Sequence, residues 1–369
     1  MAWMKPHEAI LKLPEVLFRS RMSFAFDGIP IVAEDLTLKK KLNLIKLGIS
    51  SMFFRNFSLG LPAVVQVEPT NRCNLQCPLC PAGEGSMQRG KGVMSLETYH
   101  QILDELGDVM LVVLLYSWGE PFLNRDLNSI IRASVAKNIN SLVLTNGHFV
   151  QTIDEALELV DTGLNGLLIA MDGSTQETYT AYRKGGKLEK VMRCAELVEE
   201  AKAKRGSATP YTCLRTLVTK DTQEELPDIE RLARDLGVNM FSYKTVGMQT
   251  YCDEFRDFEP TIDKLKRFEY SDSERKAQGP INCPFPFRQP TIQWDGTLVG
   301  CEYDYDVEKP FGKVGERPIR ELWNGPQART LRQHILGGEQ DTFCQRLCPY
   351  QDRVQSSSYL GNIELRPGR

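Results

Sequence analysis

The sequence has no apolar run long enough to cross a lipid bilayer. Its longest apolar stretches are short segments such as residues 109–116, well under the roughly 20 residues that a transmembrane helix needs. The first twenty residues also lack the continuous apolar core and small-residue cleavage site of a secretory signal peptide. These absences predict a cytoplasmic protein that is soluble or peripheral to a membrane.

The chain also lacks a large excess of charge of either sign. Its 369 residues carry 45 Lys and Arg against 48 Asp and Glu, a formal net charge of -3. No nucleic acid is therefore expected as a partner. Histidine is scarce, and His148 is interpreted as structural. The ten cysteines are unusual for a disulfide scaffold in a chain of this length.

What the chain does have is an alternation of strand-like and helical segments that starts near residue 62. Strands are expected at 63–67, 109–116, 142–145, 166–171, 212–218 and 240–244, and helices at 96–106, 127–137, 152–161, 187–204 and 222–236. Because each right-handed crossover returns the chain to the same side, this alternation predicts a parallel sheet. Six such units suggest an open, partial barrel.

Three cysteines follow the first expected strand with the spacing C-x3-C-x2-C, namely Cys73, Cys77 and Cys80. Thiolates are the soft ligands that iron–sulfur clusters select, and three of them can hold three irons of a cubane. The fourth iron then stays open for a ligand such as S-adenosylmethionine (SAM). The alternatives are cysteines that merely pack and a zinc site, but zinc sites usually present four ligands and no nearby histidine supplies the fourth.

This loop resembles the signature of the radical SAM superfamily, C-x3-C-x-aromatic-C after the first strand of a (β/α)6 partial barrel. One departure is Leu79, which stands where an aromatic residue usually contacts adenine; this weakens a stacking contact but not cluster ligation. Other motifs of the family follow later strands, where ligand-binding residues of parallel barrels gather. The resemblance implies SAM contacts from Leu79, Gly119, Glu120, Asn146, Asp172 and Arg183.

A second set of four cysteines follows the expected barrel: Cys283, Cys301, Cys344 and Cys348. The segment between the first two reads as a β-hairpin that turns at Asp295-Gly296. This region resembles the twitch domain, the shortened relative of the SPASM domain, which carries one auxiliary [4Fe-4S] cluster. Structural zinc is the competing interpretation of the four cysteines.

Together these patterns predict an α/β chain: a partial (β/α)6 TIM-like radical SAM barrel followed by a small α+β auxiliary-cluster domain. The implied cofactors are two [4Fe-4S] clusters and SAM. The expected segments are a helical, locally basic extension at 1–61, the barrel at 62–251, a charged linker or bridging helix at 252–280, the auxiliary domain at 281–353 and a weakly ordered tail at 354–369.

The N-terminal extension carries nine Lys and Arg against five Asp and Glu within residues 1–60. Its amphipathic pattern has two interpretations. One is a helix that contacts a membrane surface or a partner protein. The other, which we favour from the sequence, is a helix packed on the catalytic domain with its lysines in solvent.

The resemblance implies that a flavodoxin- or ferredoxin-type donor reduces the first cluster, that SAM splits to a 5′-deoxyadenosyl radical, and that this radical abstracts a substrate hydrogen. Four thiolates would leave the second cluster no open iron, so its expected role is to accept an electron from the substrate radical. This favours an oxidoreductase with a small-molecule substrate. The alternatives are a peptide- or protein-modifying maturase, a redox-neutral epimerase and a non-enzymatic metal-binding protein. The sequence identifies no catalytic acid or base.

Overall fold

The computed structural model describes residues 6–53, 56–246, 257–266, 270–271, 274–275, 283–337, 344 and 359–366. The chain divides into two compact units, which are described separately. The first unit contains residues 1–72, 87–143 and 282–339, and the second contains residues 73–86, 144–281 and 340–369. The chain enters each unit more than once, so residues far apart in the sequence are neighbours within a unit.

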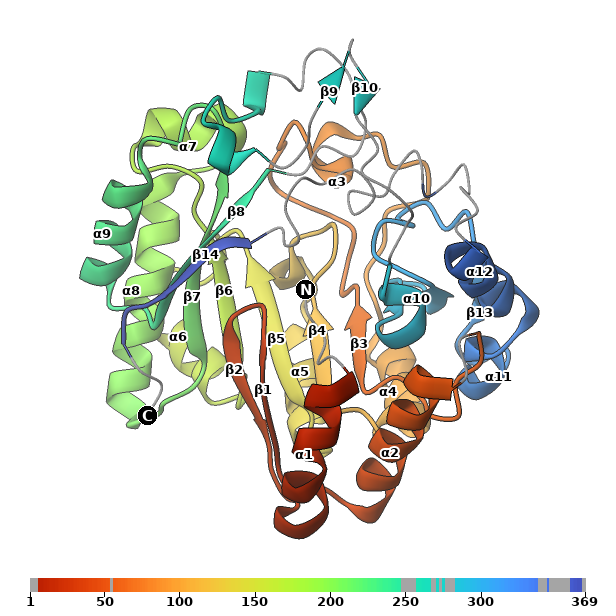
Figure 1. Ribbon diagram of the computed structural model, residues 1–369. Helices are drawn as coiled ribbons and strands as arrows, with labels where there is room; N and C mark the ends of the chain where they lie inside the picture. Colours follow the sequence, from red (N-terminus) through yellow and green to blue (C-terminus); the bar gives the residue numbers. More distant parts are fainter. Residues whose placement is uncertain are drawn as a thin grey trace. The chain divides into compact units, whose positions relative to one another are not determined.

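Short parallel strands form the centre of the first unit. β3 (Val64–Val67) pairs with β4 (Val112–Leu115), and β4 pairs with the first residues of β5 (Asn140–Thr145). Helices α4 (Leu96–Leu106) and α5 (Leu127–Ala136) connect them (Figure 1). All residues of β3 and β4 are buried, as expected for parallel strands that are covered on both faces. The predicted strand–helix alternation is confirmed here.

The hairpin predicted around Asp295-Gly296 is also confirmed. β11 (Thr291–Ile292) pairs antiparallel with β12 (Thr297–Val299), which pairs with β13 (Pro310–Lys313). A parallel pairing of β11 with β3, which the sequence did not predict, makes this hairpin part of the same sheet. Helices α11 (Ile319–Trp323) and α12 (Pro326–Gly337) contact β13, and α10 (Phe285–Arg288) contacts α12.

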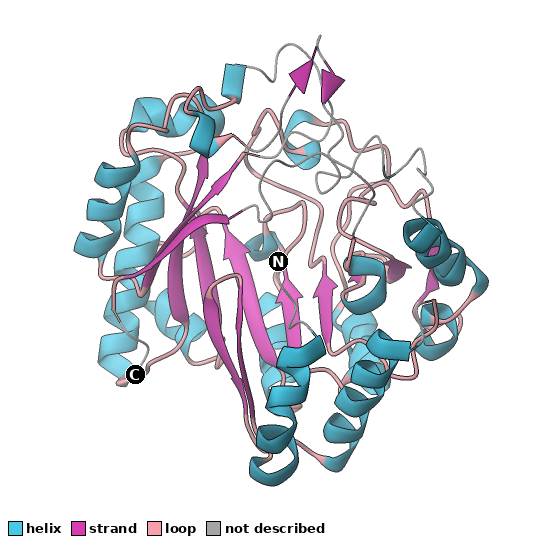
Figure 2. Cartoon of the chain, viewed as in Figure 1, coloured by secondary structure: helices cyan, strands magenta, loops and turns pink. Residues whose placement is uncertain are grey.

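The second unit repeats the strand–helix pattern. β6 (Gly166–Ala170), β7 (Tyr211–Val218) and β8 (Met240–Thr245) pair in parallel and in sequence order. The helices α6 (Ile153–Val160), α8 (Leu188–Arg205) and α9 (Leu226–Leu236) lie together on one side of these strands (Figure 2). Helix α7 (Gln176–Tyr182) begins at a capping box in which Thr175 and Thr178 satisfy each other's backbone N–H groups.

The tail was predicted to be weakly ordered from residue 354, and this is wrong for residues 359–366. β14 (Tyr359–Glu364) pairs antiparallel with β8. The backbone N–H groups of Leu365 and Arg366 then donate to the carbonyl of Asn239, at 2.8 and 3.1 Å. Pairing along an exposed strand edge depends on backbone groups, which explains why side-chain composition did not reveal it.

The charged segment at 252–280 is described only in part. It contains the 3-10 turn η3 (Asp263–Leu265) and the two-residue strands β9 (Tyr270–Ser271) and β10 (Glu274–Arg275), which pair with each other. The other residues of the predicted linker lie largely outside the described part of the chain.

The N-terminal extension was predicted to be helical, and this is wrong at its centre. Between α1 (Pro6–Arg19) and α2 (Leu38–Phe53) the chain forms a hairpin of β1 (Met22–Phe26) and β2 (Ile29–Ala33) (Figure 1). Its turn residues Asp27 and Gly28 both adopt positive φ angles, 54° and 83°. Asp-Gly between apolar segments is a known hairpin signal, so the sequence did contain the information.

Helix α2 has an unusual orientation, because the side chains it buries are the polar Lys40, Asn43 and Ser50. The Lys40 ammonium donates to the carbonyls of Lys137 and Asn138 at 3.1 and 2.5 Å, and burial lowers the pKa of Lys40 to about 8. These contacts attach the helix to the first unit through hydrogen bonds of a buried polar side chain.

Asn43 makes the most complete of these attachments. Its Nδ2 donates to the carbonyl of Leu61, and its Oδ1 accepts from the backbone N–H of the same residue, both at 2.8 Å. We expect Asn43→Ala to lower the free energy of unfolding by about 2 kcal/mol, because two buried backbone groups lose their partners. Urea unfolding followed by circular dichroism measures the change. Lys46→Ala, at an exposed position of the same helix, is the control, and equal effects of the two substitutions would contradict the assignment.

Candidate functional site

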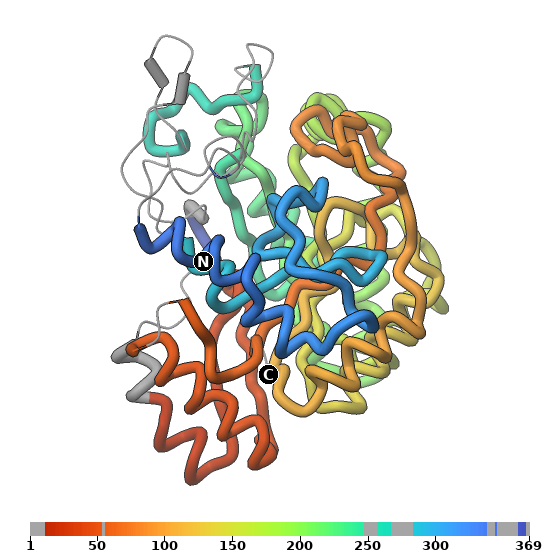
Figure 3. Tube along the Cα trace, turned by 90° about the vertical axis from the view of Figure 1, so that its right-hand side faces the viewer, coloured from red at the N-terminus to blue at the C-terminus, as the bar shows by residue number. Residues whose placement is uncertain are grey.

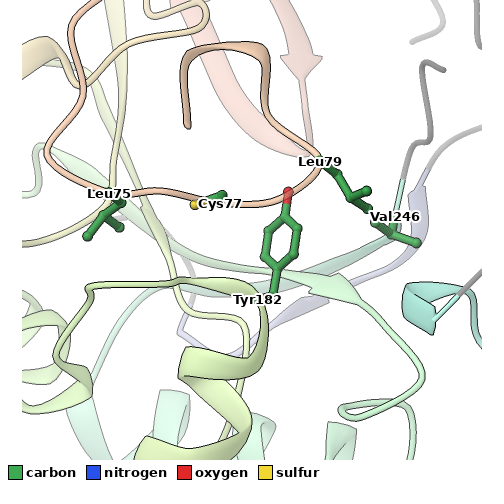
Figure 4. Close-up of a cluster of buried hydrophobic side chains, with 5 residues drawn as sticks. All are labelled: Leu75, Cys77, Leu79, Tyr182 and Val246. Atoms are coloured by element: carbon green, nitrogen blue, oxygen red, sulfur yellow. The ribbon is translucent and has the colours of Figure 1, made fainter. Parts of the chain in front are cut away.

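Cys73, Cys77 and Cys80 lie in one buried cluster of the second unit. Leu75, Cys77, Leu79, Tyr182 and Val246 form its centre, and the other two cysteines pack against it (Figure 4). The Tyr182 ring points toward the loop that carries Cys77 and Leu79. The loop predicted from the cysteine spacing is therefore folded around an apolar centre.

Two local features fix the shape of this loop. Cys80 precedes the short helix α3 (Pro81–Glu84), and its carbonyl accepts from the N–H of Gly83 at 2.8 Å. Gly83 lies so close to the loop that a Cβ atom would come within 2.6 Å of the Cys77 nitrogen. A larger residue would displace the loop, so glycine is required by close approach at this position.

Hydrogen-bond donors surround the sulfur atoms. The N–H of Leu75 and Nδ2 of Asn146 lie 3.4 and 3.9 Å from Cys73 Sγ, and Nη1 of Arg183 lies 3.8 Å from Cys77 Sγ. Burial raises the pKa of Cys77. Burial and the neighbouring Cys77 raise the pKa of Cys80 to about 12. The donors favour the thiolate form that a metal requires, whereas burial opposes it.

The donor set fits a cluster better than a single ion. Within the described ranges, no three His, Cys, Asp or Glu side chains form a group suited to one metal ion. A cubane has a different requirement, because each thiolate binds its own iron and the sulfurs do not converge on one point. Three soft sulfur donors on one loop, each with N–H groups directed at it, match three corners of a [4Fe-4S] cluster.

Asp172 and Arg183, two of the predicted SAM residues, form a pair beside Cys77. Asp172 is completely buried after β6, and its Oδ1 accepts from the backbone N–H of Leu217 at 2.6 Å. Its Oδ2 accepts from Arg183 Nε at 2.5 Å. Arg183 therefore has one edge on a buried carboxylate and another directed at a sulfur, an orientation that its planar guanidinium allows.

Asn146, the next predicted residue, is held between two partners. Its Nδ2 donates to Asn74 Oδ1 at 2.7 Å, in the cysteine loop. The His148 ring accepts at Nε2 from the N–H of Lys187 at 2.8 Å, so its Nδ1 carries a proton, 2.9 Å from the Asn146 carbonyl. Both ring nitrogens thus have partners, as expected of a structural histidine. The sequence did not predict that this histidine positions Asn146.

Gly119 and Glu120 belong to the first unit. A Cβ atom at Gly119 would come within 2.1 Å of the Thr70 carbonyl oxygen, so only glycine fits there. The N–H of Glu120 donates at 2.8 Å to the carbonyl of Arg72, the residue that precedes Cys73 in the chain. The Glu120 carboxylate also caps the turn η1 (Pro121–Leu123) through the N–H of Phe122, at 3.2 Å.

One ion pair of the first unit had no sequence signal. Glu68, which directly follows β3, is completely buried, and Arg89 Nη2 lies 2.6 and 2.7 Å from its two carboxylate oxygens. Burial raises the pKa of Glu68, and Arg89 opposes that rise. The same carboxylate accepts from the N–H of Trp294 at 3.2 Å. Glu68 therefore links the end of β3 to the turn of the β11–β12 hairpin.

The second set of cysteines is divided between the units. Cys283 and Cys301 are half-buried in the first unit, before α10 and after β12. Cys344 is buried in the second unit, and Cys348 lies outside the described residues.

Trp118 connects the loop of Gly119 with the loop of Cys301 inside the first unit. Its Nε1 donates to the carbonyl of Glu302 at 2.7 Å. Its ring contacts Tyr303 and Tyr305 edge-on, with centroids 6.0 and 5.7 Å apart. Trp118 directly precedes Gly119, and Glu302 directly follows Cys301, so the two loops are joined by one hydrogen bond.

Family models match both the region of the first three cysteines and the region of the second set. Residues 67–257 match the radical SAM superfamily, and residues 283–349 match SPASM, an iron–sulfur cluster-binding domain. The chain belongs to the radical SAM superfamily. The predicted family, the α/β fold class and the cofactors, [4Fe-4S] clusters and SAM, are thereby confirmed.

Curated relatives of this radical SAM protein have diverse roles. It is 24% identical over 299 residues to the tungsten-containing aldehyde ferredoxin oxidoreductase cofactor-modifying protein of Pyrococcus furiosus, covering 72% of this chain and 82% of the relative. It is 26% identical over 308 residues to the AdoMet-dependent heme synthase of Methanosarcina barkeri, covering 73% and 85%. It is 26% identical over 333 residues to the subtilosin biosynthesis protein AlbA of Bacillus subtilis, covering 83% and 68%.

Solved radical SAM structures share the fold. SuiB of Streptococcus suis bound to S-adenosylmethionine aligns with a TM-score of 0.60 at 13% identity, covering 79% of this chain and 72% of SuiB. Native anSMEcpe with bound AdoMet aligns with a TM-score of 0.55 at 17% identity, covering 81% and 93%. At these identities the likeness concerns the fold alone.

The Asp172–Arg183 pair generates a prediction on stability. Arg183→Gln leaves a completely buried carboxylate without its charged partner, so we expect the free energy of unfolding to fall by about 3–5 kcal/mol. Arg205→Gln removes the exposed pair with Asp161 and is expected to change stability little. Chemical unfolding of the two variants measures both effects. An Arg183→Gln protein as stable as Arg205→Gln would show that the buried pair contributes nothing.

Proposed function

We propose that this chain binds its SAM-cleaving [4Fe-4S] cluster through Cys73, Cys77 and Cys80 and carries out an oxidative modification of its substrate. When bound, the cluster and SAM supply a 5′-deoxyadenosyl radical that abstracts hydrogen. The observation that carries the proposal is the trio of thiols on one loop, with the Asp172–Arg183 pair and Asn146 beside them in the same unit.

The protein's own residues would bind and orient SAM. Arg183, fixed by Asp172, suits the SAM carboxylate because a guanidinium pairs with a carboxylate in two-point geometry. Gly119 packs against the Thr70 carbonyl, and Gly119 and Glu120 are suited to accept from the SAM amine. Leu79 offers an apolar contact to adenine in place of aromatic stacking. Asn146 would add a polar contact with SAM beside Cys73.

Cys283, Cys301, Cys344 and Cys348 are proposed as the ligands of an auxiliary [4Fe-4S] cluster. The hydrogen bond between Trp118 and the Glu302 carbonyl supports a role in electron transfer, because it couples the loop next to Cys301 to the loop of Gly119 and Glu120. Four thiolates would leave that cluster no open iron, so it would accept an electron from the substrate radical rather than bind the substrate. A flavodoxin- or ferredoxin-type protein is proposed as the external donor, and the cytoplasm as the location.

The first candidate substrate is a small molecule. A peptide is the second, and the relatives favour it. The chain is similar to AlbA, a bacteriocin biosynthesis protein, and 27% identical over 189 residues to the PqqA peptide cyclase of Rhodopseudomonas palustris, covering 51% of this chain and 48% of that enzyme. It also aligns with SuiB bound to its precursor peptide SuiA, with a TM-score of 0.59 and 13% identity, covering 88% and 80%.

The proposal about the first cluster is tested with a triple variant, Cys73→Ala, Cys77→Ala and Cys80→Ala. After anaerobic reconstitution we expect about eight irons per wild-type chain and about four in the variant, from two cubanes and one. Under strong reductant only the wild type should release 5′-deoxyadenosine, measured by chromatography. Cys194→Ala, a buried cysteine of α8, is the control. SAM cleavage that survives in the triple variant would refute the assignment.

The auxiliary role is tested with Cys301→Ala. We expect iron to fall to about four per chain, 5′-deoxyadenosine formation to persist, and the yield of oxidised substrate per SAM cleaved to collapse. Mössbauer spectra would show one cluster lost. Oxidised product formed at the wild-type yield would instead indicate a bracing role, and product of unchanged mass would favour an epimerase.

A further inference from the structure

Helix α2 exposes the side of its sequence that would ordinarily be buried. Leu38 and Phe53 are each 71% exposed, and Leu42 and Met52 are nearly half exposed. The inward positions are filled by the polar residues Lys40, Asn43 and Ser50, each of which is hydrogen-bonded. Because these polar residues anchor α2 to the first unit, Leu38, Leu42, Met52 and Phe53 face solvent.

Helix α1 adds to this exposed apolar surface. Figure 3 shows α1 and α2 side by side, and the two helices contact each other. Phe18 of α1 is 86% exposed, and Leu13 and Leu17 are exposed as well. Of the ten large apolar side chains exposed in the described part of the protein, eight lie within residues 13–53. Such a concentration marks an interaction surface, whereas isolated exposed apolar residues do not.

The charge of this segment is opposite to that of the remaining chain. Residues 1–60 carry nine Lys and Arg against five Asp and Glu, which leaves 36 against 43 in residues 61–369. Basic residues accompany the apolar ones on the same helices: Lys46 on α2 and Arg19 on α1 are exposed, whereas the exposed Lys39 pairs with Asp108 at 2.6 Å. The N-terminal segment of an acidic chain is thus basic, and it carries most of the exposed large apolar side chains in the described residues.

We propose that the surface formed by the exposed residues of α1 and α2 docks on an anionic lipid bilayer. Exposed Phe and Leu side chains next to Lys and Arg are the pattern of helices that lie in the headgroup region of such membranes. None of the described helices is long and apolar enough to span a bilayer, which agrees with interfacial binding. The positive charge favours anionic lipid over a second copy of this chain, whose surface would carry the same charge.

This inference is independent of the proposed chemistry and goes beyond it. Docking would place the reaction beside the membrane, so a substrate or electron donor held in the lipid phase would be accessible. Docking also accounts for the inward orientation of the polar side of α2, because the apolar side would then contact lipid instead of water.

Vesicle flotation tests the proposal with the full-length, cluster-loaded protein under anaerobic conditions. We expect the protein to float with vesicles of phosphatidylcholine mixed with phosphatidylglycerol, to remain largely unbound with phosphatidylcholine alone, and to dissociate as salt rises. The double variant Leu42→Gln, Phe53→Gln should lower the partition coefficient about tenfold, because two apolar side chains are lost from the interface. Phe18→Gln tests α1 separately.

Val135→Gln is the matched control, because Val135 is an exposed apolar residue of α5, 40% exposed, outside this surface. Its partition coefficient should equal that of the wild type, and circular dichroism should show all variants folded. Wild-type protein that fails to float with anionic vesicles would overturn the proposal. So would unchanged binding of both the double variant and Phe18→Gln, or a dimer, measured by light scattering, that the double variant abolishes.

Discussion

The desolvation of the Cys77 and Cys80 sulfur atoms on one loop is the constraint around which the second unit is built. Burial favours neutral thiols at Cys77 and Cys80, whereas a metal cluster needs thiolates. Arg183 Nη1 offsets this conflict at Cys77, and the backbone N–H groups of Ala82 and Gly83 offset it at Cys80. The N–H of Leu75 and Nδ2 of Asn146 are directed at the third sulfur, that of Cys73. Arg183 is in turn fixed by Asp172, and Asn146 by Asn74 and His148. The polar residues beside the loop therefore act together to stabilise thiolates on its cysteines.

The first unit joins the barrel strands to the hairpin of the SPASM region. The parallel pairing of β11 with β3 supplies backbone hydrogen bonds, and Glu68 with Arg89 closes the junction from the side. The hydrogen bond from Trp118 to Glu302 then connects the Gly-Glu-Pro loop to the residue after Cys301. The Gly-Glu-Pro loop and the Cys301 loop, joined by a bond between residues 184 apart in sequence, are therefore held together within the first unit.

The sequence predicted what depends on local patterns. Alternating apolar segments predicted the strands from β3 to β8 and the helices α4, α5, α6, α8 and α9 between them, but not the shorter α3 and α7. Asp295-Gly296 predicted the hairpin. Asp27-Gly28 is an equally clear hairpin signal, but the basic and apolar composition around it favours a helix over the whole N-terminal extension. β14 and the Glu68–Arg89 pair had no local signal, because each depends on a partner that only the folded chain supplies. The support of Asn146 by His148 belongs to the same class, since Lys187 completes it from another loop.

Helix α2 shows why amphipathicity alone does not determine orientation. A sequence pattern places apolar and polar residues on opposite sides of a helix, but it does not say which side faces the protein. Here specific hydrogen bonds determine which side faces the protein. Lys40 donates to two carbonyls at the end of α5, and Asn43 bonds to both backbone groups of Leu61. Because those bonds would be lost if the helix rotated about its axis, Leu38, Leu42, Met52 and Phe53 remain outside even though water is their least favourable environment.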